Sequence, residues 1–283
     1  MTQRETREPS RDRLVVERVG DGRRFWTETV GTFPPVYGER WIEREGRSFR
    51  GWSPSRSKLA AALDVGWEGP IPQEGETWLY LGAATGTTAS HVADLVGPKG
   101  AVYVVEKSPR PFQKLLVLAE RWPNLLPILA DARSLEEEPY PPRMVDGLYA
   151  DLPQPDQVDI VLRSARRFLR ERGTVLMALK TASMGRDLSA PLHLEQAERH
   201  LGRFLTLERT ARLAPWHRGH YFIGGEARPG FENLDLAASP PPGSPEPEPR
   251  SPHPRREGRG RGPRSDRESG RWVPRPARHG RSA

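Results

Sequence analysis

The chain of 283 residues contains no cysteine, so it can form neither a disulfide bond nor a thiolate metal site. Long hydrophobic runs are missing as well. No apolar stretch reaches the roughly 18 residues that a membrane span needs, and the first 20 residues lack the apolar core of a signal peptide. From these absences we expect a soluble cytoplasmic protein with no membrane segment, and the length allows one or two domains.

Lysine is scarce, since only five of the 44 basic residues are lysine and the others are arginine. The net charge of +7 comes from the C-terminal end, because residues 250–283 contain 11 arginines and three acidic residues while the remainder is close to neutral. Proline, glycine, serine and arginine dominate residues 229–283, and we expect disorder there because little apolar surface can be buried. This composition suits either contacts with RNA phosphates or a solvated linker, and the sequence leaves both open.

Strands and helices alternate from about residue 77 onwards. Five apolar runs predict strands at residues 77–82, 101–106, 125–131, 147–153 and 174–180. Segments with helical spacing of apolar residues separate them, and the last of these helices is expected at residues 157–173. Such alternation predicts an α/β fold with a mainly parallel central sheet and helices on both faces.

Chemically distinctive residues stand at the ends of these strands, where parallel α/β folds bind ligands. They are Gly82, Glu106, Asp131, Asp151 and Lys180. Each has a simpler explanation, because a glycine can serve only a tight turn and a strand-end acid can cap a helix. As a set they suit a nucleoside ligand without a diphosphate, since the loop GAATG departs from the dinucleotide pattern G-x-G-x-x-G. S-adenosylmethionine is the common cofactor of that kind.

Four stretches of sequence resemble the successive motifs of the fibrillarin family: GWSPSRSKLAAAL (51–63), LYLGAATGTTASHVADLVG (79–97), ILADAR (128–133) and YADLPQPDQ (149–157). The resemblance runs from about residue 14 to about residue 225, in order and with few gaps. Fibrillarins are S-adenosylmethionine-dependent 2'-O-methyltransferases of box C/D ribonucleoproteins. The resemblance therefore implies a methyltransferase that modifies ribose in rRNA or tRNA.

The resemblance also implies a division of the chain into three parts. Residues 1–52 are expected to form a small N-terminal β domain, with about the first 12 residues disordered. Residues 53–228 are expected to form a Rossmann-like class I methyltransferase domain. Residues 229–283 would then follow as the disordered tail.

Carried over motif by motif, the resemblance implies a binding site for S-adenosylmethionine. The glycine loop contributes Gly82, Ala83, Thr87 and Thr88. The ribose of the cofactor is assigned to Glu106 and Lys107, and the adenine to Asp131 and Ala132. The methionine part is assigned to Asp151, Leu152, Pro153 and Gln154. Three of these positions, Lys107, Leu152 and Pro153, depart from the usual residues of the family. Ala150 also stands where the family usually has an acid, which removes a negative charge from the site.

A catalytic tetrad of Lys58, Asp151, Lys180 and His220 is implied in the same way. A ribose hydroxyl is a poor nucleophile that needs a base, and a desolvated lysine beside a positive charge can act as one, whereas arginine stays protonated. Asp151 would hold the Lys180 amine, and His220 would orient the ribose or phosphate. No metal is expected, because His217 and His220 lack an accompanying carboxylate or cysteine at ligand spacing. A chain that uses arginine almost everywhere keeps lysine at both tetrad positions, which favours amine chemistry there.

Partners are expected because residues 1–249 have almost no net charge and should bind RNA weakly by themselves. The resemblance implies a Nop-type scaffold protein, a kink-turn-binding protein and a box C/D guide RNA. Two other functions remain open. One is a glutamine methyltransferase acting on protein, on the same fold, and the other is a non-catalytic ribonucleoprotein subunit.

Overall fold

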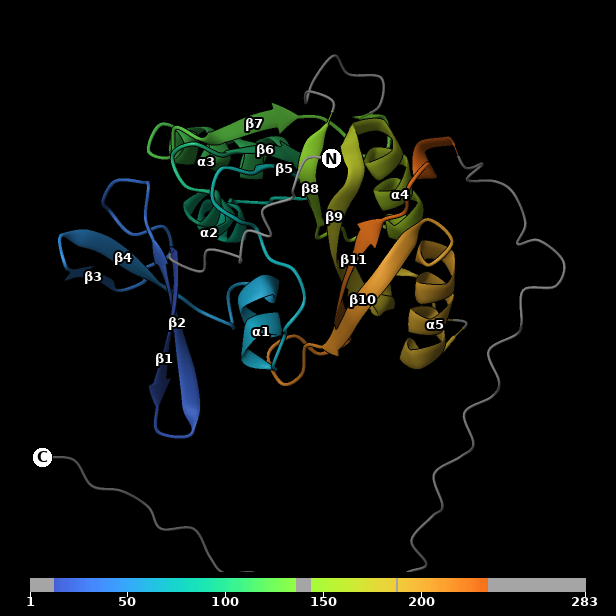
Figure 1. Ribbon diagram of the computed structural model, residues 1–283, viewed down its shortest axis with the longest axis horizontal. Coiled ribbons are helices and arrows are strands. Elements are labelled where there is room, and N and C mark those ends of the chain that lie inside the picture. The colour runs from blue at the N-terminus through green and yellow to red at the C-terminus, as the bar shows by residue number, and fades with distance from the viewer. Residues whose placement is uncertain (1–12, 136–143, 187, 234–283) are drawn as a thin grey trace, which may run out of the picture. The chain divides into compact units, whose positions relative to one another are not determined.

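The computed structural model describes residues 13–135, 144–186 and 188–233 (Figure 1). The disorder predicted for the first 12 residues, and for most of residues 229–283, therefore concerns segments outside the described residues. Within residues 229–233, however, Phe231–Asn233 form a short 3-10 helix, η4. The Phe231 side chain is buried in the hydrophobic core, so the folded part extends past the boundary expected from the sequence.

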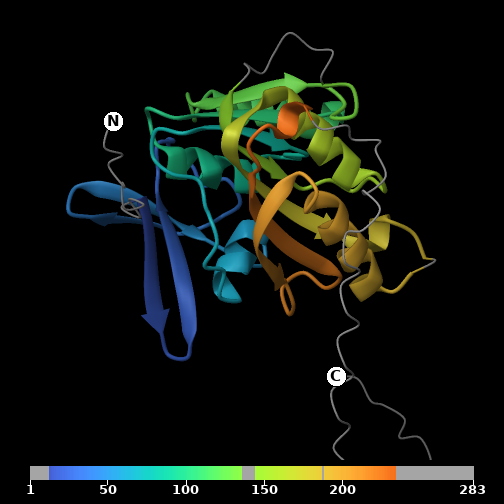
Figure 2. The same ribbon diagram turned by 45° about the vertical axis from the view of Figure 1, so that its right-hand side comes forward.

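The N-terminal part is a four-stranded antiparallel sheet in the order β1-β2-β4-β3, in agreement with the small β domain that the family resemblance implies (Figure 2). Its strands are β1 (Leu14–Val19), β2 (Gly22–Glu28), β3 (Trp41–Arg44) and β4 (Arg47–Trp52). The β3–β4 hairpin turns through Glu45 and Gly46, which both have the positive φ that a tight two-residue hairpin needs.

The main sheet has seven strands in the order β10-β11-β9-β8-β5-β6-β7, and only β11 runs antiparallel to both of its neighbours. The strands are β5 (Thr77–Leu81), β6 (Ala101–Glu106), β7 (Leu125–Leu129), β8 (Val145–Ala150), β9 (Leu169–Lys180), β10 (Leu205–Arg212) and β11 (His220–Ala227). The five strands β5 to β9 are parallel, which confirms the predicted α/β fold. The chain order reverses between β5 and β8, and ligands of open parallel sheets bind at such a point.

Helices cover both faces of this sheet. They are α1 (Lys58–Asp64), α2 (Thr87–Val96), α3 (Pro109–Ala119), α4 (Gln157–Phe168) and α5 (Ala190–Leu201), with a 3-10 turn η3 (Thr181–Ser183). The alternation of side chains along β5 explains the two layers. Trp78 and Tyr80 pack in one core with α1, α2 and α3, whereas Leu79 and Leu81 pack in the other with α4 and α5.

One element differs from the prediction. The helix expected at residues 157–173 ends at Phe168, and the segment Leu169–Gly173 instead begins strand β9. The charged sequence LRERG has good helix formers, but Leu169 pairs with Val145 of β8, and tertiary pairing overrides the local preference. Strands β10 and β11 and helix α5 were not predicted from the sequence.

A buried polar network joins the N-terminal sheet to helix α2. Arg50 of β4 is 0% exposed and donates to Asp94 of α2 at 2.6 Å, to Glu39 at 3.0 Å and to Ser90 at 2.7 Å. Trp122 donates to the second Asp94 oxygen at 2.8 Å. Because every charge in this network has a partner, burial is tolerated, and the sheet is fixed against the helix that follows the glycine loop.

Candidate active site

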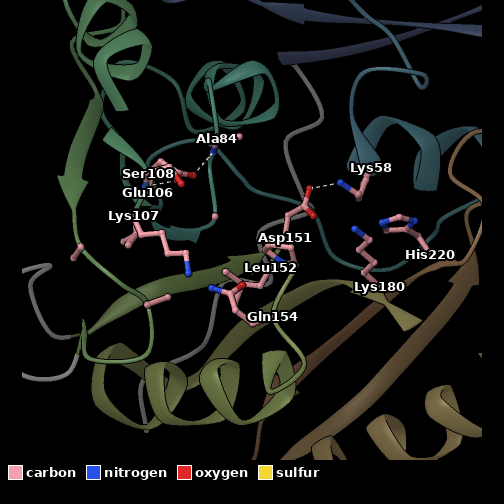
Figure 3. A pocket seen from close by; sticks show the side chains of 15 residues that line it. Lys58, Ala84, Glu106, Lys107, Ser108, Asp151, Leu152, Gln154, Lys180 and His220 are labelled. Atoms are coloured by element: carbon pink, nitrogen blue, oxygen red, sulfur yellow. Dashed lines mark hydrogen bonds and ion pairs between the residues drawn. The ribbon is translucent and has the colours of Figure 1, made fainter. Parts of the chain in front are cut away.

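A cavity of about 290 Å³ opens where β5, β6, β8 and β9 end (Figure 3). Most of the residues predicted to bind the cofactor or to act in catalysis line it: Lys58, Gly82, Glu106, Lys107, Ala132, Asp151, Leu152, Pro153, Gln154, Lys180 and His220. The structure thus brings together residues from α1, from the ends of the five strands β5 to β9 and from the start of β11. The cavity lies at the point where the strand order reverses.

The glycine loop approaches the neighbouring strand closely. Gly82 has φ +77°, and a Cβ atom at this position would lie 2.4 Å from the backbone oxygen of Asp151. Ala84 also has positive φ, of 49°, and its N–H donates to the Glu106 carboxylate at 3.0 Å. The loop therefore needs glycine at position 82. The hydrogen bond from Ala84 to Glu106 compensates for the unfavourable backbone conformation of Ala84.

Glu106 is held firmly at the end of β6. Its Oε2 accepts from the Ala84 N–H and its Oε1 accepts from the Ser108 N–H at 2.7 Å. Each carboxylate oxygen keeps a second lone pair, which can accept a hydrogen bond from a ribose hydroxyl. Gln154 supplies a further polar group, because its buried Oε1 atom has no hydrogen-bond partner in the described part of the chain. An unpartnered acceptor in the cavity wall fits a ligand that brings a donor.

Lys58 and Asp151 form an ion pair at the other end of the cavity. Lys58 is the first residue of α1, whose N-cap is Ser57, and its Nζ lies 2.6 Å from Asp151 Oδ2. Both side chains are 21% exposed. Asp151 was expected to hold Lys180, but its carboxylate pairs with Lys58 instead, because α1 brings that amine to the end of β8.

Lys180 is held through its backbone. Its N–H donates to the Gln157 side-chain oxygen, and its C=O accepts from the Gln157 amide nitrogen, each at 3.0 Å. Gln157 is fully buried at the start of α4. The pairing of β8 with β9 ends at Met177, three residues before Lys180. The Gln157 side-chain amide therefore makes the hydrogen bonds to Lys180 that a neighbouring strand would otherwise make. The amine of Lys180 forms no ion pair with the described carboxylates and lies beside His220 in Figure 3.

The geometry defines the protonation state of His220. Its Nδ1 lies 3.1 Å from the carbonyl oxygen of Arg218, which can only accept, so Nδ1 carries the hydrogen. Burial lowers the pKa of His220 below its ordinary value and favours the neutral ring. Its Nε2 is then an acceptor. The adjacent His217 is used differently, because its Nε2 donates to the Pro54 carbonyl at 2.9 Å.

Four predicted cofactor residues do not line the cavity: Ala83, Thr87, Thr88 and Asp131. Thr88 donates to Ser57 at 3.1 Å, which links α2 to the N-cap of α1, and Asp131 Oδ2 lies 3.7 Å from Lys107 Nζ. Four cavity residues were missed: Ala84, Val105, Ser108 and Ala130. Each is the immediate neighbour of a predicted residue in the sequence, so including the neighbours of each predicted residue would have found them.

The described residues contain neither a cluster of metal-binding side chains nor a membrane-spanning helix. No cluster of three or more His, Asp or Glu side chains there could hold a metal ion. No helix in the same residues is long and apolar enough to cross a membrane.

The fold and this site together define a class I S-adenosylmethionine-dependent methyltransferase, given the mainly parallel sheet with antiparallel β11, the glycine loop after β5 and the carboxylate at the end of β6. The chain belongs to the fibrillarin family, whose family model matches residues 10–229. This confirms the resemblance found in the sequence motifs.

Three relatives illustrate the similarity. A protein of Aeropyrum pernix named fibrillarin-like rRNA/tRNA 2'-O-methyltransferase is 41% identical over 211 residues, which are 74% of this chain and 90% of that protein. The crystal structure of Aeropyrum pernix fibrillarin with natively bound S-adenosyl-L-methionine is 38% identical with a TM-score of 0.67, covering 75% and 94% of the two chains. Fibrillarin in a crystal structure of the fibrillarin/Nop5p complex is 33% identical with a TM-score of 0.65, covering 75% and 97%.

Proposed function

We propose that this chain transfers a methyl group from S-adenosylmethionine to the 2'-hydroxyl of a ribose in rRNA or tRNA. The observation that carries the proposal is the meeting of Lys58, Asp151, Lys180 and His220 at one end of the cavity, opposite the end that holds Glu106 (Figure 3). The Aeropyrum pernix relative with this activity in its name and the fibrillarin structure with bound cofactor support it.

The residues of the cavity fit the cofactor. Glu106 has free lone pairs for the two ribose hydroxyls, and Gln154 has an unpartnered acceptor for a donor group. Gly82 leaves room beside the Asp151 backbone that any side chain would fill. When bound, S-adenosylmethionine supplies an electrophilic methyl group, and its sulfur keeps the electron pair of the bond that breaks.

The protein's own groups prepare the hydroxyl for attack. Asp151 pairs with Lys58 at 2.6 Å. Lys180 forms no ion pair with the described carboxylates, and we assign to it the role of accepting the hydroxyl proton. His220 accepts a hydrogen bond from the ribose or its neighbour through Nε2 and so fixes the direction of the attacking oxygen. Such positioning of fixed groups is the largest contribution that a site of this kind makes to the rate.

We further propose assembly with a Nop-type scaffold protein, as in the fibrillarin/Nop5p complex, together with a kink-turn-binding protein and a guide RNA. The near-neutral charge of residues 1–249 supports this, because most of the chain supplies little attraction for RNA.

The decisive experiment follows a labelled methyl group from S-adenosylmethionine into total RNA, with the Nop-type scaffold protein, the kink-turn-binding protein and the guide RNA present, and with the wild type beside Lys180→Ala. We expect label in RNA as 2'-O-methyl nucleotides, with kcat lower by about 10²–10⁴ in the variant because a general base is lost. Label in protein as methylglutamine would instead establish a protein methyltransferase. Binding of the cofactor by calorimetry without transfer to either polymer would establish a non-catalytic subunit.

A further inference from the structure

The N-terminal sheet has a hollow of its own, of about 570 Å³, beside the start of α1. Arg23, Arg24, Arg40 and Arg56 line it together with aromatic residues, and we call it the arginine groove. We propose that the arginine groove binds the sugar-phosphate backbone of the substrate RNA next to the nucleotide that is methylated. This inference rests on the proposed function, since it assumes that the substrate is RNA.

The charge of the arginine groove suits a polyanion. Arg24, Arg40 and Arg56 are exposed, and their guanidinium groups form no hydrogen bond or ion pair with other described residues. Glu39 is the one carboxylate among the described residues that line the groove, and it is neutralised by Arg50 at 3.0 Å and by two backbone N–H groups. Glu17 lies opposite Arg24 across the β1–β2 pair without a hydrogen bond to it. A guanidinium that makes no internal hydrogen bond is well suited to bind a phosphate in a bidentate manner.

The floor of the groove is aromatic and fixed in place. Trp26 and Trp52 are buried beneath it, and Tyr37 is half-buried with the Arg56 guanidinium 5.8 Å from its ring centre. The Tyr37 hydroxyl lies 2.8 Å from the Gly51 carbonyl oxygen and 2.9 Å from His91 Nε2, so the ring is oriented. Arginines over an aromatic floor resemble the grooves by which proteins hold RNA strands, where phosphates bind cations and sugars or bases contact rings.

The groove lies near the active site. Arg56 precedes Lys58 by two residues, a separation of at most about 7 Å along an extended chain. Pro54, which lines the groove, accepts a hydrogen bond from His217, and the His217 ring centre is 6.0 Å from that of His220. Adjacent phosphates of an RNA strand are separated by a comparable distance. An RNA strand with its target ribose at Lys180 and His220 therefore meets the arginine groove within a few nucleotides.

The test compares two variants of the full chain with the same change of charge. The first is Arg24→Gln/Arg40→Gln/Arg56→Gln, in the arginine groove. Its matched control removes three exposed arginines of α4, β9 and α5 instead, as Arg166→Gln/Arg170→Gln/Arg199→Gln. Binding of a fluorescein-labelled single-stranded RNA of mixed sequence is measured against salt concentration, and calorimetry with S-adenosylmethionine checks that each variant folds.

For the groove variant we expect a Kd for RNA raised at least tenfold and a salt slope reduced by about two, because three phosphate contacts are lost. The control should keep the wild-type Kd and slope, and both should bind the cofactor normally. Equal losses in the two variants, or none in either, would overturn the proposal. Unchanged RNA affinity with loss of Nop-type scaffold binding would assign the groove to a protein partner and overturn it as well. Failure of wild-type methyl transfer to RNA, with groove-dependent RNA binding intact, would refute only the proposed function.

Discussion

Lys180 and His220 stand directly opposite each other in the antiparallel pair of β9 and β11. Lys180 is the last residue of its strand and His220 is the first residue of the other. Opposed residues of antiparallel strands have Cβ atoms about 4.5–5.5 Å apart, so backbone pairing alone brings the amine and the imidazole to one place. A slip of one residue in this register would turn one of the two side chains to the other face of the sheet.

The backbone position of Lys180 depends on Gln157, which leads to a first prediction. Gln157→Leu should lower kcat for methyl transfer by about tenfold or more, because a displaced lysine no longer meets the ribose in line. The free energy of unfolding should fall by about 1–3 kcal/mol as buried backbone groups lose their partner. The Kd for S-adenosylmethionine should not change. Gln196→Leu, at an exposed site on α5, is the control, and an unaltered kcat in Gln157→Leu would contradict the positioning role.

The ion pair of Lys58 and Asp151 should behave as a unit. We expect Asp151→Asn and Lys58→Met each to lower kcat/KM, and the double variant to lose little more than the worse single variant, because either change already breaks the 2.6 Å contact. The coupling energy from the four values of kcat/KM should lie at about 1–3 kcal/mol. Additive losses would show that the two residues act independently.

A substitution at Gly82 has two effects, a steric clash with the Asp151 backbone and strain from the positive φ, and a second glycine separates them. Gly82→Ala should weaken binding of S-adenosylmethionine by about tenfold or more. The new Cβ would lie 2.4 Å from the Asp151 backbone oxygen and would push that backbone out of position. Gly75→Ala carries similar strain, since Gly75 has φ +83°, but it has no atom within 4 Å of the added Cβ. Calorimetry should therefore find normal cofactor affinity in Gly75→Ala. An equal loss in both variants would attribute the effect to strain alone.

Acid should destabilise the protein through His91. Its Nδ1 lies 2.8 Å from Thr27 Oγ1 and its Nε2 lies 2.9 Å from the Tyr37 hydroxyl, with Arg50 and Asp94 nearby. Burial, and then the charge of Arg50, lower the pKa of His91 well below its usual 6.5, so the folded state stays neutral while the unfolded state takes up a proton. The free energy of unfolding should therefore fall as the pH drops below about 6.5, with a slope that approaches about 1.4 kcal/mol per pH unit.

Denaturant titrations between pH 5 and pH 8 check this, with His91→Gln beside the wild type. The variant should be less stable at pH 7.5 but should lose less stability on acidification. His200→Gln, on α5, serves as the control and should keep the wild-type dependence. Parallel curves for His91→Gln and the wild type would exclude His91 as the titrating group.

The arginine-rich C-terminal segment should contribute RNA affinity that is not specific for sequence. Deletion of residues 234–283 removes 11 arginines and leaves the core residue Phe231 in place. We expect weaker binding of single-stranded RNA and a smaller salt slope, with unchanged affinity for S-adenosylmethionine. Unaltered RNA binding and salt slope after the deletion would identify the segment as a linker.

The five parallel strands and most of the site were predictable from the sequence, because the strand ends carry their own signals. Glu106, Asp151 and Lys180 each follow an apolar run, and parallel strands bring such ends together. The pairing of Asp151 with Lys58 was not predictable in this way, since it depends on where α1 packs against the sheet. Residues 169–173 were assigned wrongly for a related reason, because pairing with β8 outweighs their helical preference.

The arginine groove and the network around Arg50 also could not be predicted from the sequence. Both are built from residues distant in the chain, and an exposed arginine has the same local pattern whether it lines a groove or faces open solvent. Thr88 illustrates the reverse case. Thr88 belongs to a motif that was predicted to bind the cofactor, but it does not line the cavity. Its hydroxyl donates to Ser57 and so joins the start of α2 to the start of α1.

The contact of Arg50 with Asp94 limits how far the catalytic part can be trimmed. A fragment that starts at residue 53 would lose the guanidinium that neutralises a completely buried carboxylate, along with the Thr27 hydroxyl that donates to it at 2.9 Å. The orphaned carboxylate would have to bind a proton or open the α2 region to water, and α2 follows directly on the loop that shapes the cofactor cavity. A minimal methyltransferase derived from this chain must therefore retain the N-terminal sheet.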